Sequence, residues 1–123
     1  MMSKIEYKSY PIYNHPKMIE RFGDDLELIK ILFQDFRSNQ QIMIDKFEKS
    51  LLDEDIENAK ILIHGIKGVT ANLSAERLKF FCISFERKIE STLKENVADL
   101  QSELEQLKKE IQLFLDETDR FIE

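Results

Sequence analysis

Apolar residues recur every three or four positions along most of this 123-residue chain, and that spacing limits the folds it can adopt. Such spacing lines up apolar side chains on one face of an α-helix. The chain has only three glycines and two prolines, too few for the many turns of a β protein. In the last third, only Thr118 interrupts a heptad pattern formed by Val97, Leu100, Leu104, Leu107, Ile111, Phe114 and Phe121. The pattern therefore predicts an all-α protein.

Four long helices are expected, at about residues 24–51, 53–71, 75–93 and 96–121. Because the same spacing recurs on several helices joined by short loops, the sequence predicts an antiparallel, up-down four-helix bundle. Residues that cap helix N-termini mark the expected starts. These residues are Asp24 with Glu27, Asp53 with Asp55, Asn72 with Ser74, and Asn96 with Asp99.

The N-terminal region, residues 1–15, is expected to form an extended arm, with three tyrosines at three-residue spacing. A short lid helix should follow from His15-Pro16 to about Phe22, since proline suits the first helical position. No repeat or linker divides the remainder, so we expect a single domain over 1–123. The start at Met1 and the absence of a linker favour a protein that works alone over a piece of a larger kinase.

Composition argues against several classes of partner. A net charge of −6 with no basic cluster makes nucleic-acid binding improbable, because phosphate contacts dominate that affinity. No apolar run approaches the length of a membrane span, and the first residues lack the apolar centre of a signal peptide. The single cysteine, Cys82, suits a reducing cytosol, so we expect a cytoplasmic protein.

The candidate functional residues lie in the helix expected at about 53–71, in the segment Ile63-His64-Gly65-Ile66-Lys67-Gly68. Residues three and four apart share a helix face, so an imidazole, a cation and a bare patch of backbone are expected side by side. Lys60 and Ala71 extend this stripe. The opposite, buried face is expected to carry Ala59, Leu62, Ile66, Val69 and Leu73.

The glycines strengthen this interpretation of His64. Each costs about 1 kcal/mol relative to alanine inside a helix, and this helix has two of them beside the same histidine. A steric demand for access is the simplest cause. We therefore interpret the stripe as a site that carries an anion and admits a partner.

Other chemistries fit less well. A di-iron bundle needs Glu-x-x-His, but isoleucine stands three residues before both His15 and His64. No zinc-protease or phosphate-loop motif is present, so no metal ligands and no cofactor of its own are predicted. A hydrolase triad would need an exposed Ser or Cys near His64, and Cys82 falls on a core stripe. His15 is expected to do nothing specific.

The stretch from Asn58 to Ala75 resembles a histidine-containing phosphotransfer (HPt) domain, with His64-Gly65-Ile66-Lys67-Gly68 followed by Asn72-Leu73-Ser74-Ala75. Leu78, Phe85 and Glu86 extend the likeness, and Arg21-Phe22-Gly23-Asp24 is similar to the family's Phe-Gly-Gly-Asp motif. The resemblance covers about residues 16–93. Ile63, Ser74 and Asp24 depart from the family's small residues, and Ile63 is expected to add bulk to the docking surface.

This resemblance implies a phosphorelay intermediate rather than an enzyme with its own ATP-dependent kinase activity. His64 would accept the phosphoryl group, Lys67 would offset its charge, and Gly68 would let the partner approach. Glu86 would hold the imidazole by its Nδ1. The surrounding binding surface would comprise Lys60, Ile61, Gly65, Ala71, Lys79 and Ile83.

The implied partners are receiver domains of response regulators and a hybrid sensor histidine kinase, with Mg²⁺ held by the receiver. A monomer is expected. The alternative is an HPt-like interaction module that binds a receiver or kinase without taking phosphate. A histidine-kinase dimerisation domain is third, because Gly65 follows the histidine where such domains commonly have an acidic residue, and no proline occurs after Pro16.

Overall fold

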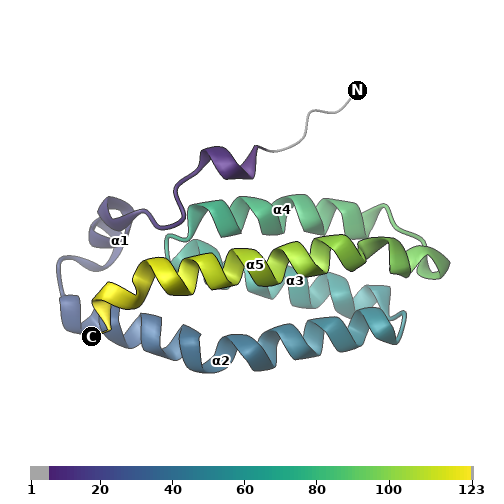
Figure 1. The fold of residues 1–123 in the computed structure, drawn as a ribbon, viewed down its shortest axis with the longest axis horizontal. Coiled ribbons are helices and arrows are strands. Elements are labelled where there is room, and N and C mark those ends of the chain that lie inside the picture. The colour runs from purple at the N-terminus through teal and green to yellow at the C-terminus, as the bar shows by residue number, and fades with distance from the viewer. Residues whose placement is uncertain (1–5, 123) are drawn as a thin grey trace.

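The computed structural model describes residues 6–122, and it consists of four long helices with a short fifth helix at one end (Figure 1). Successive long helices run antiparallel, and no strand occurs within the described part of the chain. The long helices are α2 (Leu26–Leu52), α3 (Ile56–Asn72), α4 (Glu76–Glu90) and α5 (Gln101–Thr118), and the short one is α1 (His15–Phe22). The predicted all-α bundle with a lid helix is confirmed.

The bundle encloses a core in which phenylalanines of α2, α4 and α5 meet. Phe47 of α2 and Phe85 of α4 contact each other edge to face, with ring centroids 5.3 Å apart. Phe33 and Phe114 join α2 to α5 in the same way at 5.8 Å. All four rings are at most 1% exposed, so each buries an area that contributes about 2 to 3 kcal/mol. No helix among residues 6–122 has the length and apolar character that crossing a membrane requires.

The N-terminal arm is bound along α4 rather than projecting freely. Its residues Tyr7–Ser9 form a 3₁₀ turn, η1, and Tyr7 contacts the ring of Phe81 edge to face at 5.0 Å. Tyr10 stacks on Phe80, with ring centroids 3.8 Å apart. The backbone N–H of Arg77 donates to the carbonyl of Pro11. The expectation for residues 1–5 lies outside the described residues.

Several helix starts differ from their predicted positions. Asp25, not Asp24, caps α2 by accepting a hydrogen bond from the backbone N–H of Leu28. Asp55 caps α3 as expected. Ala75 precedes α4 without a side-chain cap, because Ser74 takes a left-handed conformation, φ 56°, that closes the preceding helix instead.

The end of the chain is less regular than one continuous helix. The chain leaves α4 at Glu90, earlier than predicted, and residues Lys94–Leu100 form a 3₁₀ segment, η2. Asn96 lies inside η2 with non-helical angles and caps nothing with its side chain. A third 3₁₀ element, η3 (Asp119–Phe121), follows α5, so the heptad pattern predicted the core positions better than it predicted the boundaries.

The buried face of α3 is rotated from the predicted one. Ile63 and Thr70 are fully buried, whereas Val69 is 39% exposed. The predicted face placed Val69 inside and left out the other two. The cause is that α3 contacts both α4 and α2, so its buried arc points between two neighbours rather than directly away from His64.

A buried ion pair joins α4 to α5 beneath the arm. Arg77 donates to both carboxylate oxygens of Glu110, from Nε at 2.8 Å and from Nη2 at 3.0 Å. Gln106 also donates to Glu110, whose side chain is only 1% exposed. The guanidinium also lies 5.8 Å from the centre of the Tyr7 ring. The pair therefore connects the arm, α4 and α5 at one point.

Removing one partner of this pair should destabilise the fold strongly. Glu110→Ala leaves a largely buried guanidinium without its carboxylate, and we expect the free energy of unfolding to fall by about 3 kcal/mol in urea denaturation. Glu117→Ala, which removes an exposed carboxylate on the same helix, should change it by less than about 0.5 kcal/mol. Equal effects of the two substitutions would contradict the importance of the pair.

Candidate functional site

His64 lies on the outer face of α3, and its side chain is 70% exposed. Gly65 and Gly68 are exposed beside it, and Ile61 is 69% exposed one turn earlier. This outward arc contains a ring nitrogen and bare backbone with one apolar side chain. A partner can therefore reach the imidazole without any rearrangement of the bundle.

A single carboxylate on α4 contacts two residues of α3. Glu86 accepts a hydrogen bond from the Lys67 ammonium at 2.7 Å through Oε1, and its Oε2 lies 3.0 Å from Nδ1 of His64. The Glu86 side chain is 15% exposed and that of Lys67 is 26% exposed. The contact between His64 and Glu86, which the resemblance implied, is thus present, and Lys67 contacts the same carboxylate.

The charge of Glu86 determines which nitrogen of His64 carries the proton. Burial by itself would raise the pKa of this carboxyl, but hydrogen bonds from Lys67 and His64 and their charges outweigh it, so the pKa is lowered from its ordinary value of 4.5. An ionised carboxylate can only accept hydrogen bonds. In the neutral imidazole the proton is therefore on Nδ1, and the lone pair of Nε2 is available on the exposed side of the ring.

The two glycines beside His64 are not needed by the packing of this chain. A Cβ atom built at either Gly65 or Gly68 would find no neighbouring atom within 4 Å. Neither residue has a positive φ that would demand glycine. Their smallness is therefore unexplained by the isolated fold and is consistent with a surface that another molecule approaches.

The remaining predicted surface residues lie along the α3–α4 seam or beside it. Lys60 forms an ion pair with Glu57 on its own helix at 3.3 Å. Ala71 and Lys79 line one small hollow, and Ile83 is half-buried. Ile63, expected to bulk out the docking surface, is fully buried in the core instead. Its position, one residue before His64, turns its side chain toward the bundle interior.

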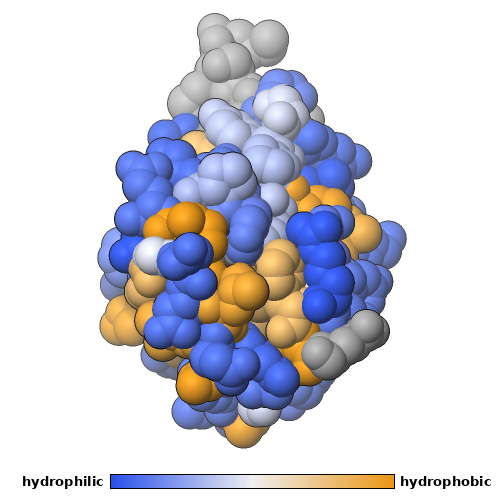
Figure 2. Space-filling model, turned by 90° about the vertical axis from the view of Figure 1, so that its left-hand side faces the viewer, coloured by the Kyte–Doolittle hydropathy of each residue, from blue (hydrophilic) through white to orange (hydrophobic). Residues whose placement is uncertain are grey.

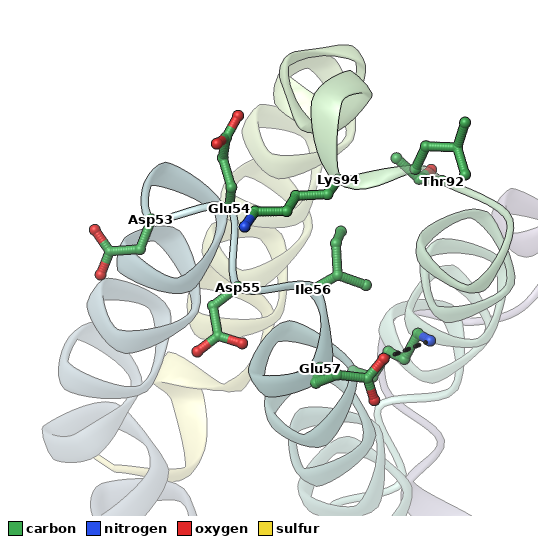
Figure 3. A pocket seen from close by; sticks show the side chains of 9 residues that line it. Asp53, Glu54, Asp55, Ile56, Glu57, Thr92 and Lys94 are labelled. Atoms are coloured by element: carbon green, nitrogen blue, oxygen red, sulfur yellow. Dashed lines mark hydrogen bonds and ion pairs between the residues drawn. The ribbon is translucent and has the colours of Figure 1, made fainter.

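A second hollow, of about 620 Å³, lies at the opposite end of the seam (Figure 3). It is formed by the α2–α3 turn, including Asp53 and Asp55, and by the chain after α4, including Thr92 and Lys94. It has no histidine or cysteine in its lining. It therefore offers no nucleophile of the kind found at His64.

The other cysteine and histidine side chains, Cys82 and His15, are buried or in contact with neighbouring residues. Cys82 is fully buried, and burial raises the pKa of its thiol to about 12, so it is not a nucleophile at neutral pH. Nδ1 of His15 lies 2.8 Å from the Tyr13 hydroxyl, and its ring stacks on Phe121. Within residues 6–122, no group of three or more His, Cys, Asp or Glu side chains is arranged to hold a metal ion.

The sequence pattern did not predict the cations that α1 brings to the seam. Lys17 and Arg21 line the same hollow as Ala71 and Lys79. Arg21 also donates to the carbonyls of Ala71 and Asn72, at 2.7 Å each, and so caps the end of α3. Their four-residue spacing places both on one face of α1, but only the tertiary structure shows that this face meets α3.

Comparison with known proteins agrees with this geometry. Residues 31–120, well over half of the chain, match the family model described as the Hpt domain. No curated protein and no solved structure matches the chain. Hpt domains are phosphoryl carriers of two-component phosphorelays and interact with receiver domains. With an exposed histidine on a helical bundle and a match of this extent, the chain belongs to the Hpt domain family.

Proposed function

We propose that this chain shuttles a phosphoryl group between receiver domains through Nε2 of His64. The observation that carries the proposal is the bridging carboxylate of Glu86, which holds Nδ1 and leaves Nε2 facing solvent. An imidazole held in this way is oriented for attack on a phosphorus atom brought by a partner. A module that only binds its partner would not need that orientation.

In the transfer step, the lone pair of Nε2 attacks the phosphorus of the receiver's aspartyl phosphate. A P–N bond forms, the P–O bond to the aspartate breaks, and the aspartate leaves as a carboxylate. The imidazole keeps its Nδ1 proton and becomes positively charged. Glu86, already ionised and 3.0 Å away, stabilises that charge, and the reverse step passes the group to an aspartate of the next receiver.

Lys67 and the glycines support the same step in different ways. Lys67 contacts Glu86 directly, so its first effect is to keep that carboxylate ionised and in place. Its charge also offsets the negative charge of the phosphoryl group. Gly65 and Gly68 leave open space in which the receiver's backbone can approach Nε2. Phosphoryl transfer depends mainly on such positioning and charge stabilisation.

We further propose that the receiver, and not this chain, holds the Mg²⁺ ion that assists chemistry at its aspartate. The chain itself would act without ATP, as a monomer, and its receivers would belong to response regulators or to a hybrid sensor kinase. Mixing the purified protein with receivers, with and without EDTA, tests whether the transfer requires magnesium.

Replacing the acceptor should abolish phosphorylation. His64→Gln keeps the size and polarity of the side chain but removes the nucleophile, so no acid-labile phosphate should appear after incubation with a phosphorylated receiver. His15→Gln is the matched control and should accept phosphate at the rate of the unmodified protein. If His64→Gln still becomes phosphorylated, the proposed function is wrong. If the unmodified protein binds the receiver but takes no phosphate, the interaction module is supported instead.

Removing the charge of Glu86 should slow transfer without unfolding the bundle. For Glu86→Gln we expect a decrease on the order of tenfold in the transfer rate, with an effect of similar size or smaller for Lys67→Ala. Glu90→Gln, at an exposed position on the same helix, should leave the rate unchanged. Equal rates for all three variants would reduce Glu86 and Lys67 to a structural ion pair.

The pH dependence of stability provides a separate measure of Glu86. Its pKa is lower in the folded state than the ordinary value of 4.5, so its contribution to stability is fully present above that value. The contribution is lost as the pH falls through the lower folded-state pKa. In thermal melts, the difference between the unmodified protein and Glu86→Gln should therefore be constant at neutral pH and shrink below about pH 4. A difference that grows in acid would contradict this sign.

A side chain at Gly68 should block the partner but not the fold. Gly68→Ala should raise the stability by up to about 1 kcal/mol, because alanine favours helix and a Cβ meets open space. Gly68→Gln should fold as well, yet transfer from a receiver should fall sharply while labelling by phosphoramidate, a small phosphoryl donor, stays unchanged. Transfer at the parent rate would show that the glycine has no role in docking.

A further inference from the structure

A small hollow at the α1 end of the seam gathers positive charge on a protein whose net charge is −6. Lys17 and Arg21 of α1 and Lys79 of α4 line it, together with residues of the α3–α4 turn. Figure 2 views the molecule from this end and shows hydrophilic surface interrupted by apolar patches. Lys17 and Arg21 are exposed and Lys79 is half-buried, so all three cations are accessible.

These three cations lack a carboxylate partner within residues 6–122, as do six other lysines and arginines, but these three line one hollow together. Eight other lysines and arginines of residues 6–122 form ion pairs, among them Lys67, Arg77 and Lys108. Within the same described residues, Lys17, Arg21 and Lys79 form none. Arg21 donates to backbone carbonyls, and the Lys79 ammonium lies 4.5 Å from the centre of the Phe80 ring. Glu76, the acidic residue in the lining, accepts a hydrogen bond from Asn14.

The hollow lies on the same edge of α3 as His64. Ala71, in its lining, is seven residues from His64, which is two helical turns or about 10 Å along the axis. Seven residues also bring the side chain back to nearly the same angle. A domain-sized partner seated over His64 would therefore cover the hollow as well. The phosphoryl group itself, bound at Nε2, is too far away to reach it.

We propose that Lys17, Arg21 and Lys79 form a second contact for the receiver domain, where they bind acidic side chains on the rim of its phosphorylation site, about 10 Å from the phosphoacceptor aspartate. This inference rests on the proposed function. A site that holds Mg²⁺ and accepts phosphate on an aspartate must itself be lined by carboxylates, so the approaching face of a receiver is acidic. The unpaired cations complement that face and orient it over His64.

The position of α1 suggests that this contact contributes to partner choice. The transfer chemistry is carried by α3 and α4, whereas two of the three cations come from the lid helix. Receivers whose rim lacks acidic residues at this place would dock more slowly, which separates partners by association rate.

Charge reversal at the two lysines tests the contact without disturbing the cap that Arg21 provides. Lys17→Glu and Lys79→Glu each place a negative charge in the first turns of α1 or α4, where the helix dipole favours it, so both variants should fold. Lys109→Glu changes the net charge equally on α5, across the bundle from α3, and is the matched control (Figure 1).

Stopped-flow binding and phosphotransfer should be measured against a panel of purified receiver domains. For the receiver that binds the unmodified protein best, each reversal should lower the association rate about three- to tenfold at low ionic strength, and 0.5 M NaCl should remove most of the difference. Lys109→Glu should change it less than about twofold. Phosphoramidate labelling of His64 should be the same in every variant.

The possible results separate the two proposals. Equal effects of Lys109→Glu and Lys17→Glu, no effect of either hollow substitution, or a failure of every receiver to bind would overturn the second contact. Inorganic phosphate that binds in the hollow, seen by NMR, while the reversals leave receiver binding unchanged would also overturn it. If receiver binding depends on Lys17 and Lys79 but His64 takes no phosphate from any donor, the contact stands and the proposed function falls.

Discussion

The tight turn at Leu73–Ala75 holds α3 and α4 side by side, and the site depends on the register that this turn sets. Helix α3 provides no carboxylate for its own histidine, because Glu57, the acidic residue of that helix, is paired with Lys60. The carboxylate comes from α4, where Glu86 meets both His64 and Lys67. A slip of one residue between the two helices would rotate Glu86 by about 100° and remove both contacts.

Other contacts hold α4 in place on its side away from the site. Arg77 joins α4 to the buried Glu110 of α5, and its backbone N–H binds the carbonyl of Pro11 in the arm. The arm adds Tyr7 and Tyr10 against Phe81 and Phe80. Because α4 is held by these contacts on one side, Glu86 can be presented rigidly on the other. Rigid positioning matters in transfer reactions that use little covalent machinery.

The site combines a fixed interior with an open exterior. Ile63 and Ile66 anchor α3 in the core, whereas the residues that face outward beside His64 are two glycines. The helix thus retains glycines at a cost of about 1 kcal/mol each, and the packing of the isolated chain gives no reason for them. The buried apolar arc supplies the stability that permits this cost, and the open arc leaves room for another molecule.

Much of the molecule followed from sequence alone. Three-four spacing with few glycines and prolines determined the helical bundle, since only a helix places such residues on one face. The grouping of His64, Lys67 and Gly68 was also visible, because helical neighbours are separated by three or four positions. The likeness to HPt domains rested on these residues and was confirmed by the family match.

Other features depended on contacts between segments distant in sequence, which local spacing does not encode. The rotation of the buried arc that places Ile63 inside and Val69 partly outside follows from α3 having two neighbouring helices. Helix packing in the same way produces the contact between Lys67 and Glu86 and the burial of Glu110. It also brings Lys17, Arg21 and Lys79 together. The sequence by itself determined which residues share a helix face, and the tertiary structure decided what each face meets, because charge and burial depend on neighbours in space.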